Sequence, residues 1–189
     1  MSRRRLVPLL AAAFAVVSFA PAGRALAQTV VQTERIDPFG QEITLAAKTI
    51  VYMTGSGTWS TAFDTLVGAF KTLQAYLDKE GLKASGPPMT IYTGMDDTSF
   101  NFQAALPVAE RPKKPPEGNI GVGTSPEGKA LKFVHRGSFE STTSTYDAIT
   151  HYVDEKQITA QELLIEEYVT DLATTADDKL IVNIFVPLK

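Results

Sequence analysis

Glu166 and Tyr168 form the residue pair of this chain best suited to chemistry at a binding site. They lie two positions apart in residues 163–169, where the sequence predicts a β-strand, so both are expected on one face together with Leu164. A carboxylate partly removed from water is costly unless a cation or hydrogen-bond donors compensate it. Tyrosine faces beside it add cation–π attraction of about 0.5–2 kcal/mol each. The pair therefore favours binding of a positively charged ligand.

The opposite face of this predicted strand is largely apolar, and we expect it to pack against a helix. It carries Leu163, Ile165, Glu167 and Val169. Glu167 interrupts the apolar pattern, and a place where the strand reaches solvent would account for it.

Most other catalytic chemistries lack their residues here. The chain has no Cys, so it has neither a thiol nucleophile nor a disulfide, and it has no Gly-x-Ser-x-Gly motif. Gly121-Val122-Gly123 lacks the third glycine and the following helix of a nucleotide-binding fingerprint. His135 falls on the apolar face of its predicted strand, which favours a structural role, and neither it nor His151 has carboxylates at metal-ligand spacing. The sequence therefore predicts no metal and no cofactor.

The second half of the chain repeats the first. Residues 51–61 align with residues 131–141, and residues 104–108 align with residues 184–188, at one common offset of 80 positions. A match at a fixed period indicates a duplicated unit. We expect the two units to pack together around a shared crevice, which is a natural place for a ligand.

Each unit is predicted to have the order strand, helix, strand, strand. Gly55-Ser56-Gly57 is expected to end the first strand, and Gly81 to end the first helix. The periodicity predicts strands at 49–54, 89–93, 100–106, 119–124, 129–135, 163–169 and 180–187, and helical stripes from Phe63 to Leu77 and from Tyr146 to Val153. This order predicts an α+β fold, in which an antiparallel sheet carries one helix on each half.

The N-terminus is predicted to be a signal peptide. Three arginines at 3–5 precede an apolar run at 6–19, and Ala25-Leu26-Ala27 fits a cleavage site, with the cut expected after Ala27. A flexible leader at 28–41 would follow, and then a domain at 42–189, with units at 42–108 and 119–189 and a proline-rich linker at 109–118. We expect a periplasmic or secreted protein without a membrane anchor.

The charge of the chain disfavours nucleic acid as a partner. The full sequence carries −3, and four arginines would leave with the signal peptide, so the mature chain would carry −7. An acidic protein repels phosphate backbones and mildly favours cationic ligands.

The residues around the second predicted helix resemble the GyrI-like effector-binding domain, whose members include ligand-binding domains of multidrug-sensing regulators and whose fold is related to the haem-binding SOUL-like fold. The markers are residues 133–139, Glu166-Glu167-Tyr168, and the terminal residues 184–188. The resemblance implies that Glu166 faces a central cavity and meets cationic or polar groups of aromatic ligands, with Tyr168 beside it.

The repeat extends this candidate site to both halves. Tyr92 aligns with Tyr168, so each unit supplies one tyrosine to the crevice, and Trp59 aligns with Phe139 at its rims. The final strands of the units add side chains that mix amides with an aromatic ring. These are Gln103, Asn183 and Phe185.

The sequence predicts a stand-alone, exported protein that binds a small aromatic or cationic amphipathic molecule and has no DNA-binding segment. A hydrolase of strained electrophilic molecules that uses Glu166 as general base or nucleophile is one alternative. Haem binding, which the related fold implies, is another. A structural adaptor is a fourth possibility, and it would have a sealed and fully packed crevice.

Overall fold

The computed structural model describes residues 39–189. The predicted signal peptide at 1–27 and most of the predicted leader therefore lie outside the described residues. No helix within 39–189 is long and apolar enough to cross a membrane.

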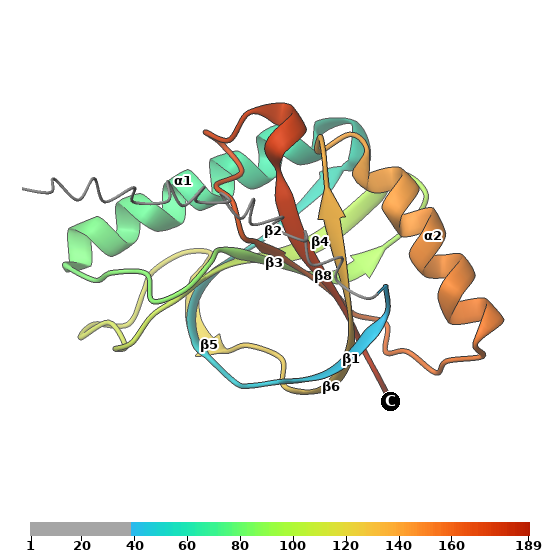
Figure 1. Ribbon diagram of the computed structural model, residues 1–189. Coiled ribbons are helices and arrows are strands. Elements are labelled where there is room, and N and C mark those ends of the chain that lie inside the picture. The colour runs from blue at the N-terminus through green and yellow to red at the C-terminus, as the bar shows by residue number, and fades with distance from the viewer. Residues whose placement is uncertain (1–38) are drawn as a thin grey trace, which may run out of the picture. The chain divides into compact units, whose positions relative to one another are not determined.

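An antiparallel sheet of eight strands carries two helices on one of its faces (Figure 1). Its strand order is β1-β6-β8-β7-β3-β4-β2-β5, so β7 and β3 meet at the centre. The first strand of each half pairs with the other half, β1 with β6 and β5 with β2. The elements are β1 (Gln41–Leu45), β2 (Thr49–Thr58), the 3-10 turn η1 (Trp59–Thr61), α1 (Ala62–Glu80), β3 (Met89–Met95), β4 (Ser99–Pro107), β5 (Ile120–Thr124), β6 (Gly128–Arg136), α2 (Thr142–Glu155), β7 (Leu164–Tyr168), η2 (Asp177–Lys179) and β8 (Ile181–Pro187).

The α+β fold class agrees with the sequence prediction, with two local differences. Strand β1 was not among the predicted strands. Strand β2 continues through Gly55 and Gly57, which were expected to end it. A Cβ at Gly55 would lie 2.6 Å from Cζ of Phe102, and one at Gly57 would lie 2.9 Å from Cζ of Phe100. These glycines therefore make room for aromatic rings of β4 within a continuous strand.

The main core lies between the sheet and the two helices. Helix α1 buries Leu66, Leu73 and Leu77 at helical spacing against β2 and β4. It ends as predicted at Gly81, whose φ of 68° is a left-handed conformation that glycine adopts without strain. Helix α2 buries only Thr142 and Ile149, so it has fewer apolar anchors than α1.

The face of the sheet away from the helices carries a smaller core. The residues of this core correct the expected orientation of β7. Ile165 belongs to this smaller core, away from the helices. Glu166 and Tyr168 point to the helical side instead, where Phe70 of α1 packs edge-to-face on Tyr168 at 5.4 Å between ring centroids. The expectation that the Ile165 face packs against a helix was therefore wrong. Both faces of β7 are covered, so an apolar face alone does not reveal which side the helices occupy.

Candidate functional site

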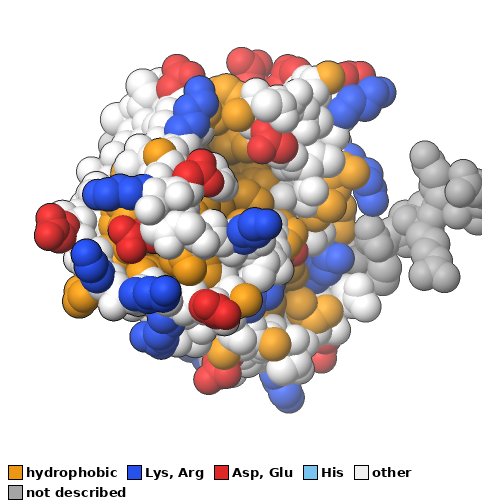
Figure 2. All heavy atoms as spheres, turned by 90° about the vertical axis from the view of Figure 1, so that its left-hand side faces the viewer, with side chains coloured by type: hydrophobic (Ala, Val, Ile, Leu, Met, Phe, Trp, Pro, Cys, Tyr) orange, Lys and Arg blue, Asp and Glu red, His pale blue; other side chains and the backbone are white. Residues whose placement is uncertain are grey.

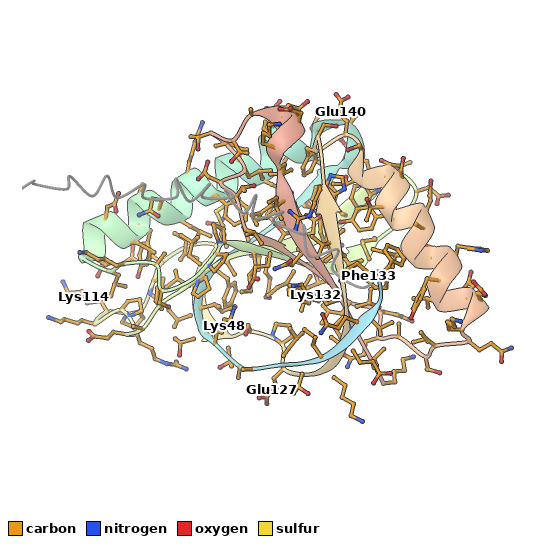
Figure 3. All side chains as sticks on the ribbon, viewed as in Figure 1. Lys48, Lys114, Glu127, Lys132, Phe133 and Glu140 are labelled. Atoms are coloured by element: carbon orange, nitrogen blue, oxygen red, sulfur yellow. The ribbon has the colours of Figure 1, made fainter. Side chains whose placement is uncertain are left out.

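A pocket of about 950 Å³ opens on the helical side of the sheet. Its walls come from η1 and the first turn of α1, from the end of β3 and the turn after it, and from the start of α2. Leu164 and Glu166 of β7 complete the lining. Glu140, which belongs to the lining, lies beside the start of α2 above the sheet, whereas Lys48 and Lys132 lie on the other side (Figure 3).

Three tyrosine hydroxyls converge on the carboxylate of Glu166. Tyr92 of β3 and Tyr168 of β7 donate to Oε2 at 2.9 and 2.6 Å, and Tyr146 of α2 donates to Oε1. Thr90 lies 3.0 Å from the Tyr168 oxygen. Because the single proton of Tyr168 goes to Glu166, the Thr90 hydroxyl is the donor in that contact. The carboxylate is thus held by donors from three different elements.

Glu166 is only 1% exposed, yet it has no cationic partner in the pocket. The lining residues of the described chain include no Lys, Arg or His. They do include five further acidic side chains, namely Asp64, Asp96, Asp97, Glu140 and Asp147. By contrast, the face of the molecule that Figure 2 shows carries charged side chains of both signs.

The negative charge acts directly on the tyrosines that surround it. Burial, and then the charge of Glu166, raise the pKa of Tyr92, Tyr146 and Tyr168 well above the usual value of 10.0. The three phenols therefore stay protonated at neutral pH and remain donors toward the carboxylate.

Apolar side chains surround the mouth of the pocket. Trp59, Phe63 and Met95 are 39%, 40% and 47% exposed, and all three belong to the lining. The Trp59 indole N–H donates to the carbonyl of Asp96 at 2.8 Å, and its ring lies 6.0 Å from that of Tyr92. These contacts hold the Trp59 ring in place while one side of it stays open to solvent. The mouth therefore offers an apolar, aromatic surface above an acidic floor.

The structure brings together most of the predicted site residues, although not all of them. Tyr92, Glu166, Trp59 and Phe139 line the pocket. Tyr168 supports Glu166 from behind the lining.

Gln103, Asn183 and Phe185 lie on the opposite face of the sheet, which corrects their expected grouping with Glu166. Gln103 is registered with Ile91, and Phe185 with Ile165, both in the smaller core. Directly paired residues of antiparallel strands share a face, so the sheet separates these side chains from Glu166.

Glu167 also belongs to that opposite face, where two partners account for it. Lys48 forms an ion pair with it at 2.9 Å, and the Asn183 amide donates to its second oxygen at 3.1 Å. The neighbouring acids of β7 thus serve different sides of the sheet. Glu167 has a cation, whereas Glu166 has only hydroxyl donors.

Tyr146 is the site residue that the sequence reasoning missed. It was expected only as part of the apolar stripe of the second helix, because its spacing with Ile149 and Val153 fits helix packing. Its hydroxyl instead reaches Glu166, 20 residues further along the chain. Only the docking of α2 over β7 makes this contact visible.

Comparison with known proteins identifies the family. The model of the GyrI-like small molecule binding domain matches residues 41–189. This chain belongs to that family. No curated protein sequence matches the GyrI-like chain.

Several solved structures share the fold of this GyrI-like domain. A cryo-EM structure of an EcmrR–DNA complex superposes with a TM-score of 0.68 at 15% identity, over 79% of this chain and 57% of that chain. SAV2435 bound to tetraphenylphosphonium superposes with a TM-score of 0.57 at 17% identity, over 79% and 93% of the two chains. A hydrolase from Listeria innocua gives a TM-score of 0.54 at 12% identity, over 80% and 92%. At these identities the likeness establishes the fold alone.

Proposed function

We propose that this GyrI-like domain binds an organic cation with an aromatic or otherwise apolar body. The observation that carries the proposal is a carboxylate, that of Glu166, buried at 1% exposure at the base of a 950 Å³ pocket with no cationic side chain in its lining. Three phenols stabilise the charge but do not neutralise it. A ligand cation would supply the missing positive charge in a region of low dielectric, where the attraction is strong.

The mouth of the pocket suits the apolar part of such a ligand. Trp59, Phe63 and Phe139 present aromatic rings around the opening, and Phe63 and Phe139 pack edge-to-face at 5.5 Å. Each ring adds apolar contact area and, for a cation near its face, about 0.5–2 kcal/mol of cation–π attraction. Together with the five solvent-exposed acidic side chains of the lining, this arrangement favours cations over neutral molecules of the same size.

Calorimetric titration with matched ligands tests the proposal. Tetraphenylphosphonium is a suitable cation, because SAV2435, which shares the fold, is bound to it. Triphenylphosphine oxide is a neutral molecule with similar rings. We expect the cation to bind at least tenfold more tightly, and quenching of Trp59, the single tryptophan of the chain, would report the same event. Equal affinities for the two molecules would contradict the proposal.

We further propose that the protein is exported and binds its ligand outside the cytoplasm. The support is the arrangement at the N-terminus, where arginines at 3–5, an apolar run at 6–19 and Ala25-Leu26-Ala27 follow the order of a signal peptide. Fractionation of cells that express the full chain, followed by N-terminal sequencing, should give a periplasmic or secreted protein that begins at Gln28. A full-length cytoplasmic protein would refute export.

Hydrolysis of a strained electrophile is the second candidate function. The observation that favours it is geometric: the carboxylate of Glu166 is hydrogen-bonded to the phenol of Tyr146, so a potential base and a protonated hydroxyl lie side by side. With an epoxide, water would attack carbon and lose a proton to Glu166, the ring C–O bond would break, and Tyr146 would protonate the oxygen. Release of diol from styrene oxide by the wild type, and its loss in Glu166→Gln, would favour this function.

The remaining alternatives find less support at the pocket. Neither His135 nor His151 lies in the lining, so a bound haem would have no histidine ligand there, and a Soret band of the purified protein would be the sign of haem. A structural adaptor was expected to have a sealed crevice, and an open pocket of about 950 Å³ is at odds with that.

A further inference from the structure

His135 at the end of β6 is a buried histidine outside the pocket, and both of its ring nitrogens have partners. Its side chain is 3% exposed. Nδ1 lies 2.8 Å from the hydroxyl of Thr145, and Nε2 lies 2.9 Å from the carbonyl oxygen of Ser138. These partners belong to two different segments, the first turns of α2 and the loop that precedes them.

The partners determine where the proton of the ring resides. A carbonyl oxygen only accepts, so Nε2 carries the hydrogen that is directed at Ser138. In the neutral ring Nδ1 is then an acceptor, and the Thr145 hydroxyl donates to it. The His135 ring therefore donates a hydrogen bond to the loop at Ser138 and accepts one from helix α2 at Thr145.

Both segments carry residues of the pocket wall. Ser138 directly precedes Phe139 at the mouth, and Thr145 directly precedes Tyr146, the helical donor to Glu166. Contacts of the Ser138 carbonyl with the backbone N–H and hydroxyl of Ser141 tie the loop to the helix start at 3.2 and 2.8 Å. A shift of this corner would therefore move the mouth and the Tyr146 hydroxyl together.

At the start of helix α2, bonds to the preceding loop include the one from the Thr142 hydroxyl to the carbonyl of Phe139 at 2.6 Å. The N-cap of α2, Ser141, makes no side-chain capping bond, and the helix buries only Thr142 and Ile149. The hydrogen bond from Thr145 to the buried His135 ring adds a direct link from the first turns of α2 to strand β6.

We infer that His135 is a positioning residue of the binding site, which acts through Thr145 to fix the Tyr146 hydroxyl on Glu166. The readout in ligand affinity rests on the proposed function, since it uses an organic cation as the probe. The inference also has a readout that needs no ligand, because a fixed Tyr146 phenol beside the carboxylate resists ionisation.

A double-mutant cycle tests the inference. Thr145→Val removes the hydroxyl that bonds to His135 and keeps the size of the side chain, and Tyr146→Phe removes the hydroxyl that bonds to Glu166. We expect Thr145→Val to weaken tetraphenylphosphonium binding roughly three- to tenfold, as the loss of one hydrogen bond does. The same change made in the Tyr146→Phe background should have less than a twofold effect, because no bond is left to position.

Thr72→Val is the matched control, because the Thr72 hydroxyl bonds within α1 to the carbonyl of Gly68 at 2.9 Å and lies outside the pocket lining. It should leave the affinity unchanged. If Thr145→Val has the same effect with and without the Tyr146 hydroxyl, Thr145 acts independently of that group and the inference is wrong.

A pH titration separates this inference from the proposed function. The pKa of each tyrosine is measured by NMR from the Cζ signals of labelled protein. In Thr145→Val the pKa of Tyr146 should move down toward its usual value, while those of Tyr92 and Tyr168 stay raised. A wild type that fails to bind tetraphenylphosphonium would refute the proposed function and leave this readout intact. An unchanged Tyr146 titration in Thr145→Val would refute the positioning role.

Discussion

Replacement of Glu166 by glutamine isolates the charge of the buried carboxylate from its shape. Glutamine retains one acceptor oxygen, so part of the network with Tyr92, Tyr146 and Tyr168 survives, with the new amide donating toward a phenol oxygen. The variant loses the cost of burying a charge as well as the stronger charge-assisted bonds. These two effects oppose each other, so we expect the free energy of unfolding to change by no more than about 1 kcal/mol.

The effect on ligand affinity is expected to be much larger. A cation about 4 Å from a carboxylate gains roughly 4 kcal/mol at an effective dielectric constant of 20. Removal of the cation from water offsets part of this gain and leaves about 2–3 kcal/mol. That free energy corresponds to roughly a 30- to 150-fold loss of affinity. A neutral ligand should lose less than about threefold, because it has no charge to pair with Glu166.

Glu167→Gln is the matched control for this measurement. Glu167 is the next residue of the same strand, but it faces the other side of the sheet and pairs with Lys48 at 2.9 Å. The Lys48 side chain is 41% exposed, so the loss of this ion pair should cost at most about 1 kcal/mol of stability. Its effect on the affinity for the cation should be less than twofold.

Titration calorimetry of the two variants with tetraphenylphosphonium and triphenylphosphine oxide gives all the affinities required, and urea unfolding gives the stabilities. Comparable losses for the two ligands in Glu166→Gln would show that shape, and not charge, dominates recognition. Comparable losses of cation affinity in Glu166→Gln and Glu167→Gln would show a general effect of removing an acid from β7. Either result would refute the assignment of Glu166 as the charged anchor.

Three further predictions concern the rings and hydroxyls around Glu166. Trp59→Leu should weaken binding of tetraphenylphosphonium about three- to tenfold by loss of an aromatic face, whereas Trp59→Phe, which keeps a ring, should lose less, as calorimetry would measure. Tyr146→Phe should weaken binding of the cation about five- to tenfold in calorimetry, because a carboxylate with one donor fewer is less firmly oriented. The pKa values of Tyr92, Tyr146 and Tyr168 are raised in the folded state, so the tyrosines of the unfolded chain ionise first as the pH rises. Urea unfolding should therefore show that the free energy of unfolding falls above about pH 10, and that it falls less steeply in Tyr168→Phe.

Local sequence patterns predicted the fold class, and together with the resemblance to the GyrI-like domain they singled out Glu166. Alternation along β7 correctly placed Glu166 and Tyr168 on one face, because the period of a strand is a property of its backbone. The fit of Gly81 to a helix end was also local, since it follows from the freedom of glycine at positive φ. The strand pairings of β1 with β6 and of β5 with β2 join distant segments, and no local pattern contains them.

The choice of the helical side could not be made from the sequence of β7 alone. The pattern of Leu163, Ile165 and Val169 indicated an apolar face, and Ile165 does lie in a core, but in the smaller one. Glu167 was the residue that did not fit an apolar face. Its partner is Lys48, which lies 119 positions away in the sequence. The expected grouping of Gln103, Asn183 and Phe185 with Glu166 did not allow for the sheet that lies between them.

Tyr146 shows most directly why a ligand site of this kind escapes sequence reasoning. A tyrosine in an apolar helical stripe packs well through its ring, and the stripe would look the same if its hydroxyl had no partner. The site arises because three phenols from β3, α2 and β7 meet at one carboxylate. Those donors make the charge of Glu166 tolerable in the folded protein without cancelling it. The fold therefore carries an unneutralised acid at the pocket floor, and a bound cation would relieve that electrostatic cost.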